Sequence, residues 1–181
     1  MRKLIPSISV IAVILGVAVS TSSSDRGRRH KFEADLNGKN EVTSAGGAIS
    51  TVAKGSFSAR LSNDGKTLSY RLRYTGLEDD ITQAHIHIGQ FHTSGGISVF
   101  LCKTEANPGP TPDLTPFCPD PRSGEVEGTL TEANVFGPAA QGVAAGEFEE
   151  LVRLMRAGVT YANVHSLKFP AGEIRGQIRE D

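Results

Sequence analysis

The sequence predicts an all-β protein: an antiparallel Greek-key β-sandwich of about eight short strands with one short amphipathic helix. Several segments alternate apolar and polar residues with the period of two that a half-buried strand requires. Gly and Pro contribute 20 and 9 of the 181 residues and divide the chain at short intervals. Only one segment has a helical period instead. Short strands separated by many turns are typical of sandwiches and Greek-key barrels.

Each predicted strand rests on its own alternation. In residues 68–74, four apolar residues alternate with Ser69, Arg71 and Arg73, which predicts one buried face and one charged face. Asp64-Gly65 precedes this segment and favours a tight hairpin with residues 56–61. The other predicted strands are residues 31–36, 82–88, 97–102, 125–130, 160–165 and 173–179.

Residues 147–157 predict the single helix. Their apolar residues recur at i, i+3, i+4 and i+7: Phe148, Leu151, Val152 and Met155. Glutamates occupy the first turn, arginines occupy the last turns, and Gly158 follows. Charges of these signs complement the helix dipole, and Gly suits the left-handed residue after a helix. We expect the apolar stripe to pack across one end of the sandwich.

The N-terminus predicts export. A positive start at residues 1–3 precedes an uncharged apolar stretch at 4–19, and small residues follow. This is the layout of a secretory signal peptide over residues 1–20. Residues 21–30 then predict a flexible tether, and residues 31–181 form the domain. An uncleaved membrane anchor is the alternative, although the stretch is shorter than the roughly 20 residues that a spanning helix needs. We expect a secreted or periplasmic protein with no membrane contact after cleavage.

The net charge and the cysteine content indicate which partners and which cysteine chemistry to expect. The formal charge is −1, whereas a nucleic-acid-binding domain normally carries a basic excess, so we expect no nucleic-acid partner. The two cysteines, Cys102 and Cys118, predict one disulfide in an exported chain. A pair of metal thiolates is the competing interpretation, but no CxxC spacing supports it.

The histidines are the candidate metal ligands. In the segment 84–88, Ala84 and the two isoleucines share one strand face, so His85 and His87 share the opposite face. By the same alternation His165 lies on the non-core face of its own strand, and His92 follows in a loop as a candidate fourth ligand. Three imidazoles with an open fourth position suit copper or zinc. The alternative is that these side chains form hydrogen bonds with neighbouring loops or carboxylates.

Three separated motifs resemble the CHRD domain family. They are ADLNGKNEV at residues 34–42, AHIHIG at 84–89, and GVTYANVHS at 158–166 followed by PAGEIRGQI at 170–178. They occur in the family's order, and the resemblance covers about residues 31–180. It implies an extracellular-type domain without an assigned reaction. The insert between the two cysteines departs from a minimal domain of this family.

A weaker resemblance is to copper-zinc superoxide dismutase. The order of His85, His87 and His165 is similar to the copper ligands of that sandwich, whereas its zinc loop is not recognisable here. The resemblance implies at most a copper-only or mononuclear site. Arg175 and Glu173 lie on one side of their strand; Arg175 could guide an anion to a metal or form an ion pair with Glu173.

Two functions from different classes follow. The first is an exported domain that binds copper, or alternatively zinc, through surface histidines, and stores the ion or cycles it with a small oxidant. The second is a non-catalytic extracellular module that binds a protein or matrix polymer. The chain lacks GxSxG, P-loop, GxGxxG and HExxH motifs, so none of those catalytic classes is predicted.

Overall fold

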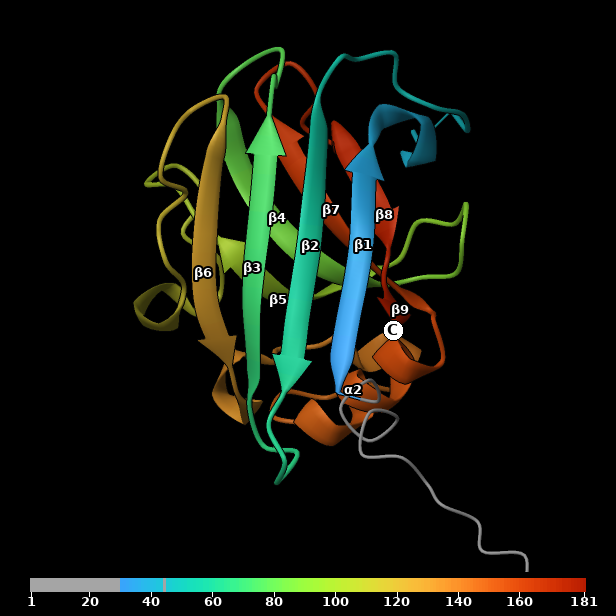
Figure 1. The fold of residues 1–181 in the computed structure, drawn as a ribbon, viewed down its shortest axis with the longest axis vertical. Coiled ribbons are helices and arrows are strands. Elements are labelled where there is room, and N and C mark those ends of the chain that lie inside the picture. The colour runs from blue at the N-terminus through green and yellow to red at the C-terminus, as the bar shows by residue number, and fades with distance from the viewer. Residues whose placement is uncertain (1–29, 44) are drawn as a thin grey trace, which may run out of the picture.

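The computed structural model describes residues 30–43 and 45–181, which form a two-layered antiparallel β structure with one α-helix (Figure 1). The predicted signal peptide and the tether up to residue 29 lie outside the described residues. The strands are β1 (Lys31–Asn37), β2 (Lys54–Leu61), β3 (Leu68–Thr75), β4 (Ile81–Ile88), β5 (Gly96–Cys102), β6 (Gly124–Leu130), β7 (Thr160–Ser166), β8 (Ile174–Gln177) and β9 (Arg179–Glu180).

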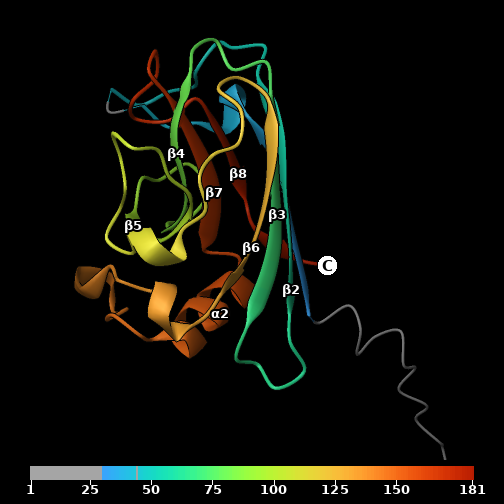
Figure 2. The same cartoon turned by 90° about the vertical axis from the view of Figure 1, so that its left-hand side faces the viewer.

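The hydrogen-bonded strand order is β5-β4-β7-β8-β1-β2-β3-β6, with β9 paired to β1. Strands β1, β2, β3 and β6 form one layer, and β8, β7, β4 and β5 form the layer behind it (Figures 1 and 2). The chain crosses between layers after β3, β5 and β6, which produces the non-sequential order of a Greek-key arrangement. The predicted fold class is confirmed. Nine strands replace the expected eight because the last predicted segment is divided between β8 and β9.

The core lies between the two layers and follows the predicted alternation. Strand β3 is buried and exposed in strict alternation along its whole length. Phe32, Phe57, Leu72 and Ile86 are almost inaccessible to solvent. Burying each such side chain stabilises the fold by roughly 1.5–3 kcal/mol relative to leaving it exposed.

The helix α2 (Phe148–Arg156) packs at the lower end of the sandwich (Figure 2). Its four buried residues are the predicted stripe: Phe148, Leu151, Val152 and Met155. On its outer side, Arg153 pairs with Glu150 one turn earlier. The predicted helix is confirmed, with bounds one residue shorter at each end.

Cys102 and Cys118 form a disulfide, with their Cα atoms 5.0 Å apart. The bond joins the end of β5 to the far end of the Pro-rich segment 103–117. Within residues 30–43 and 45–181, no helix is long and apolar enough to cross a membrane.

Candidate metal centre

The candidate site lies on the outer face of the back layer. Ala84, Ile86 and Ile88 of β4 turn inward and join the core. The alternation of the strand therefore turns His85 and His87 to the opposite face, as predicted. Antiparallel pairing with β7 aligns His87 with Tyr161 and Gln83 with His165, which brings the third histidine to the same face.

The three histidines converge. His85, His87 and His165 each offer one ring nitrogen, and these nitrogens lie within 4.8 Å of one another. Nδ1 of His85 is 3.2 Å from Nε2 of His165. The ring centroids of His85 and His87 are 5.3 Å apart. An ion placed between them would be within reach of all three rings.

The expectation that these histidines lie at the surface is wrong. Their exposed fractions are 0% for His85, 7% for His87 and 6% for His165. The reason is that loops cover the outer face of the back layer. Gly95 and Pro170 contribute carbonyl groups to the covering, and Phe100 of the edge strand β5 packs on His85 with ring centroids 4.2 Å apart.

Backbone carbonyls orient two of the rings. The Nδ1–H groups of His87 and His165 donate to the carbonyl oxygens of Gly95 and Pro170, each at 2.9 Å. This assignment follows from the hydrogen-bond network, since a carbonyl only accepts. It leaves Nε2 of both rings unprotonated, and Nε2 of His165 accepts a hydrogen bond from Nδ1–H of His85. Nε2 of His87 and Nε2 of His85 are buried without a hydrogen-bond partner.

Burial keeps these imidazoles neutral. Desolvation lowers the pKa of His87 to about 4; the hydrogen bond to Gly95 opposes this shift, and the charges of His165 and Arg175 add smaller lowering contributions. Desolvation also lowers the pKa of His165, and it lowers that of His85 well below the usual value, assisted there by the two neighbouring histidines. All three rings are thus neutral at pH 7, with one N–H and one unprotonated nitrogen each, which is the form that binds metal ions.

The donor set fits a transition-metal ion. Three neutral imidazoles converge, and two carry the hydrogen bond from the remote ring nitrogen to a carbonyl that fixes metal-binding histidines in proteins. Two buried nitrogens lack any other partner. Buried polar atoms are normally hydrogen-bonded, so the arrangement is costly unless something binds there.

Tyr161 and Arg175 form one wall of the site. The Tyr161 ring stacks on His87, with centroids 4.7 Å apart and planes 5° from parallel. The guanidinium carbon of Arg175 lies 3.4 Å from the centroid of the same Tyr161 ring. Arg175 is buried and donates to the carbonyl of Gln90 in the covering loop. Its guanidinium therefore contacts Tyr161 and does not face open solvent.

The expected ion pair between Arg175 and Glu173 is replaced by other partners for both residues. Glu173 is fully buried, and its Oε1 accepts hydrogen bonds from the Thr51 hydroxyl at 2.7 Å and the Glu78 backbone N–H at 2.9 Å. It thereby links the β8 end to two loops.

Sequence reasoning missed Glu41. This carboxylate is 5% exposed, accepts a hydrogen bond from the Asn163 side chain, and interacts electrostatically with Arg175. Burial raises its pKa, against the opposing hydrogen bonds from Val42 and Asn163. It lies inside the first CHRD-like motif, but no spacing in the sequence distinguishes it from an exposed loop glutamate.

His92 lies outside the cluster. It is exposed at the tip of the loop after β4, with φ +61°, and its ring stacks on Phe91 with centroids 3.9 Å apart. The structure brings together three of the four predicted ligands.

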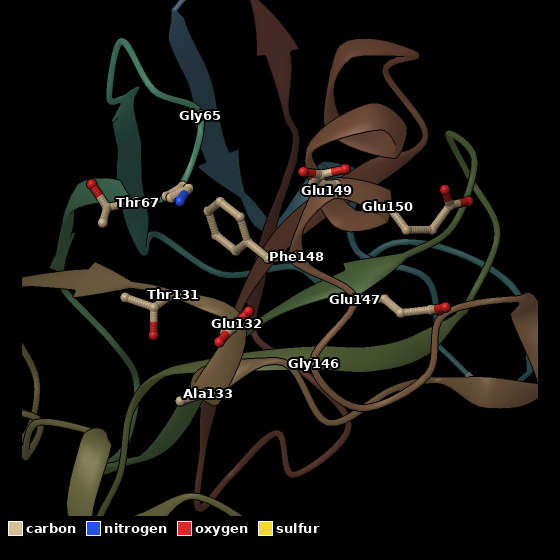
Figure 3. A pocket seen from close by; sticks show the side chains of 11 residues that line it. Gly65, Thr67, Thr131, Glu132, Ala133, Gly146, Glu147, Phe148, Glu149 and Glu150 are labelled. Carbon is tan, nitrogen blue, oxygen red and sulfur yellow. The ribbon is translucent and has the colours of Figure 1, made fainter.

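A separate cleft lies between α2 and the β2–β3 hairpin (Figure 3). Its lining includes Glu132, Glu147, Glu149 and Glu150. Glu147 accepts from the Ala144 backbone, and Glu150 is paired with an arginine of its own helix. These contacts are internal, and we assign the cleft no ligand.

Comparison with known families agrees with the motifs. The family model of the CHRD domain matches residues 32–178. The chain belongs to the CHRD domain family. No curated protein and no solved structure matches it. The CHRD match and the disulfide are consistent with an extracellular or secreted protein, and the three buried histidines lie within the matched CHRD region.

Proposed function

We propose that this CHRD domain binds one transition-metal ion through His85, His87 and His165. The convergence of three ring nitrogens within 4.8 Å carries the proposal. Two of these nitrogen-bearing rings are oriented by carbonyl acceptors, and burial holds all three neutral. We further propose that the chain is exported, with residues 1–20 as its signal peptide, and that the domain acts in a secreted or periplasmic setting.

Copper is the first choice of metal and zinc is the alternative. Imidazole donors suit both ions, and among divalent first-row ions copper binds most tightly to a given set of donors. Zinc accepts three histidines with a fourth position open to water. The absence of a carboxylate from the convergent group keeps the three protein ligands neutral. In this proposal Arg175 acts by holding Tyr161 against His87, in place of guiding an anion through solvent.

Titration calorimetry of tag-free protein with Cu²⁺ and with Zn²⁺ at pH 7.5 tests the proposal. We expect one site per chain, and loss of tight binding in His85→Ala, His87→Ala and His165→Ala. His92→Ala is the matched control, because this histidine is exposed and lies outside the cluster. The metal affinity of this variant should stay within about threefold of wild type, which is a change in binding free energy of well under 1.4 kcal/mol.

The same binding event has an optical readout. The chain has no Trp and three Tyr, and Tyr161 stacks directly on His87. Cu²⁺ should therefore quench tyrosine emission, and Tyr161→Leu should remove most of that response. Affinity weaker than about 10 µM for both ions, which is about −7 kcal/mol, would contradict the metal proposal. So would equal affinity in wild type and all three histidine variants.

The second candidate function is a non-catalytic module that binds an extracellular protein or matrix polymer. The observation that favours it is the exposure of large apolar side chains on loops, with Val52 80% and Leu167 62% exposed. Absence of metal binding, together with a folded and soluble domain, would leave this function as the better candidate.

A further inference from the structure

Each of the three histidines is held in a different way. The loop at residues 89–95 holds His87 through the Gly95 carbonyl, and the loop at residues 167–172 holds His165 through the Pro170 carbonyl. His85 has no carbonyl anchor: its Nδ1 forms a hydrogen bond only with Nε2 of His165, at 3.2 Å, and its own Nε2 has no partner. The Phe100 ring also packs on it, edge to face, with centroids 4.2 Å apart and planes at 72°.

Phe100 is in turn contacted by the Pro-rich insert. Gly109, in the segment 103–117, lies so close to this ring that a Cβ atom added to it would be 2.9 Å from Cδ1 and Cε1 of Phe100. Real Cβ atoms almost never approach so closely, so only a glycine backbone fits against the ring. Gly109 also has φ +71°, a conformation that side chains disfavour. The insert thus contacts the ring that holds His85.

The insert is fastened at its base. The Cys102–Cys118 disulfide closes it. The backbone N–H of Lys103 donates to the Pro116 carbonyl, and the N–H of Cys118 donates to the Lys103 carbonyl, each at 2.9 Å. These contacts pair the two ends of the segment, so the position of Gly109 depends on a covalently closed loop.

We infer that the disulfide-closed loop, residues 103–117, is the gate of the histidine site: through Gly109 and Phe100 it fixes His85 and controls how fast a metal ion enters and leaves. The inference rests on the proposed metal-binding function for its kinetic consequence. The fixing of His85 is a property of the metal-free protein and is measured separately. It assigns a role to the segment in which this chain departs from a minimal CHRD domain.

Gly109→Ala tests the contact, with Gly65→Ala as the matched control. The two glycines have nearly equal φ, +71° and +73°, so both substitutions place a side chain in the left-handed region. A Cβ at Gly65 meets no atom within 4 Å, whereas a Cβ at Gly109 meets Phe100. Two rates are measured for each variant: the labelling of His85 by diethylpyrocarbonate in metal-free protein, resolved by fragment mass spectrometry, and the release of Zn²⁺ to excess chelator.

We expect Gly109→Ala to raise both rates at least tenfold over wild type and Gly65→Ala to change them less than twofold. Cys102→Ser with Cys118→Ser should act as Gly109→Ala does, and circular dichroism checks that this variant is folded. Phe100→Leu, which keeps the loop closed but removes the ring, should also raise both rates.

Equal His85 labelling in Gly109→Ala, the double serine variant and wild type would overturn the inference. If the labelling rises but wild type binds no metal ion, the loop still fixes His85 and the proposed function has failed instead. If wild type binds Zn²⁺ and release is unchanged while labelling rises, the loop does not control exchange, and the kinetic part of the inference is wrong.

Discussion

Acidification should destabilise the metal-free protein well above the pH at which most carboxylates titrate. The cause is the buried histidine cluster, in which desolvation holds the pKa of His87 at about 4 and lowers those of His85 and His165. In the unfolded chain an imidazole has a pKa of about 6.5. Between the two values the unfolded state binds a proton that the folded state does not, so stability falls as the pH falls.

The magnitude follows from the size of the shift. A single histidine contributes about 1.4 kcal/mol per pH unit inside the window between its unfolded and folded pKa. For His87 that window runs from about 6.5 to about 4, which corresponds to roughly 3 kcal/mol in total. His85 and His165 act in the same direction. Domains of this kind are stable by only about 5–15 kcal/mol, so the loss is a large part of the whole.

Urea unfolding of the metal-free protein at several pH values between 7.5 and 4.5 measures the effect. The free energy of unfolding should fall steeply below about pH 6.5, with a slope above that of one histidine. His87→Gln should reduce the slope by about 1.4 kcal/mol per pH unit whatever its effect on stability at pH 7.5. Glu41 has a raised pKa in the folded protein and opposes this fall in stability, because on acidification it binds a proton in the folded state before it does so in the unfolded state. A flat profile from pH 6.5 to 5, or equal slopes in wild type and His87→Gln, would refute the argument.

Three further outcomes are expected. Leu151→Asp should unfold or badly destabilise the domain, because it places a charge in the contact between helix and sheet. Glu149→Lys, on the exposed side of the helix, should change stability by no more than about 0.5 kcal/mol. Equal shifts of the melting temperature in the two variants would contradict the assignment of the buried stripe. Gly172→Ala should lower the melting temperature, because its φ is +129° and a Cβ there would lie 2.5 Å from a buried carboxylate oxygen; an unchanged melt would show that this region can relax. Mass spectrometry without reductant should show a deficit of about 2 Da for the Cys102–Cys118 bond, and two free thiols in exported protein would disprove it.

Strand identity and strand face could be predicted from the sequence. Strict alternation in residues 68–74 assigned the buried side of β3, and the same period placed His85 and His87 together opposite Ile86. Local patterns suffice for these features because the side-chain direction in a strand depends only on the parity of its position. The helix could also be predicted, since its apolar spacing and the charges at its two ends both indicated a helix over the same residues.

The covering of the histidine face could not be predicted in the same way. Exposure depends on how the loops fold back over a face. Here Gly95 and Pro170, in the loops that follow β4 and β7, contact His87 and His165, and Gly109 of the insert contacts Phe100. No local period encodes them. The burial of Glu41 could not be predicted for the same reason, because it depends on the loop that carries Glu41 folding against Asn163 of β7.

The register of β4 explains why the three histidines converge. Alternation along the strands alone would only place them on the same face. Its pairing with β7 contains an irregularity between Ile81 and Gln83, after which Gln83 lies opposite His165 and His85 lies opposite Asn163. His165 is therefore a diagonal neighbour of His85, within the reach that diagonal cross-strand neighbours allow for long or aromatic side chains. The pairing of β4 with β5 is also irregular, once between Ala84 and His85 and again between Ile86 and His87. Bulges of this kind redirect side chains and are common beside functional sites. The convergence is thus a consequence of strand register: alternation fixes the face on which each histidine lies, and the β4–β7 pairing fixes which histidines are neighbours on that face.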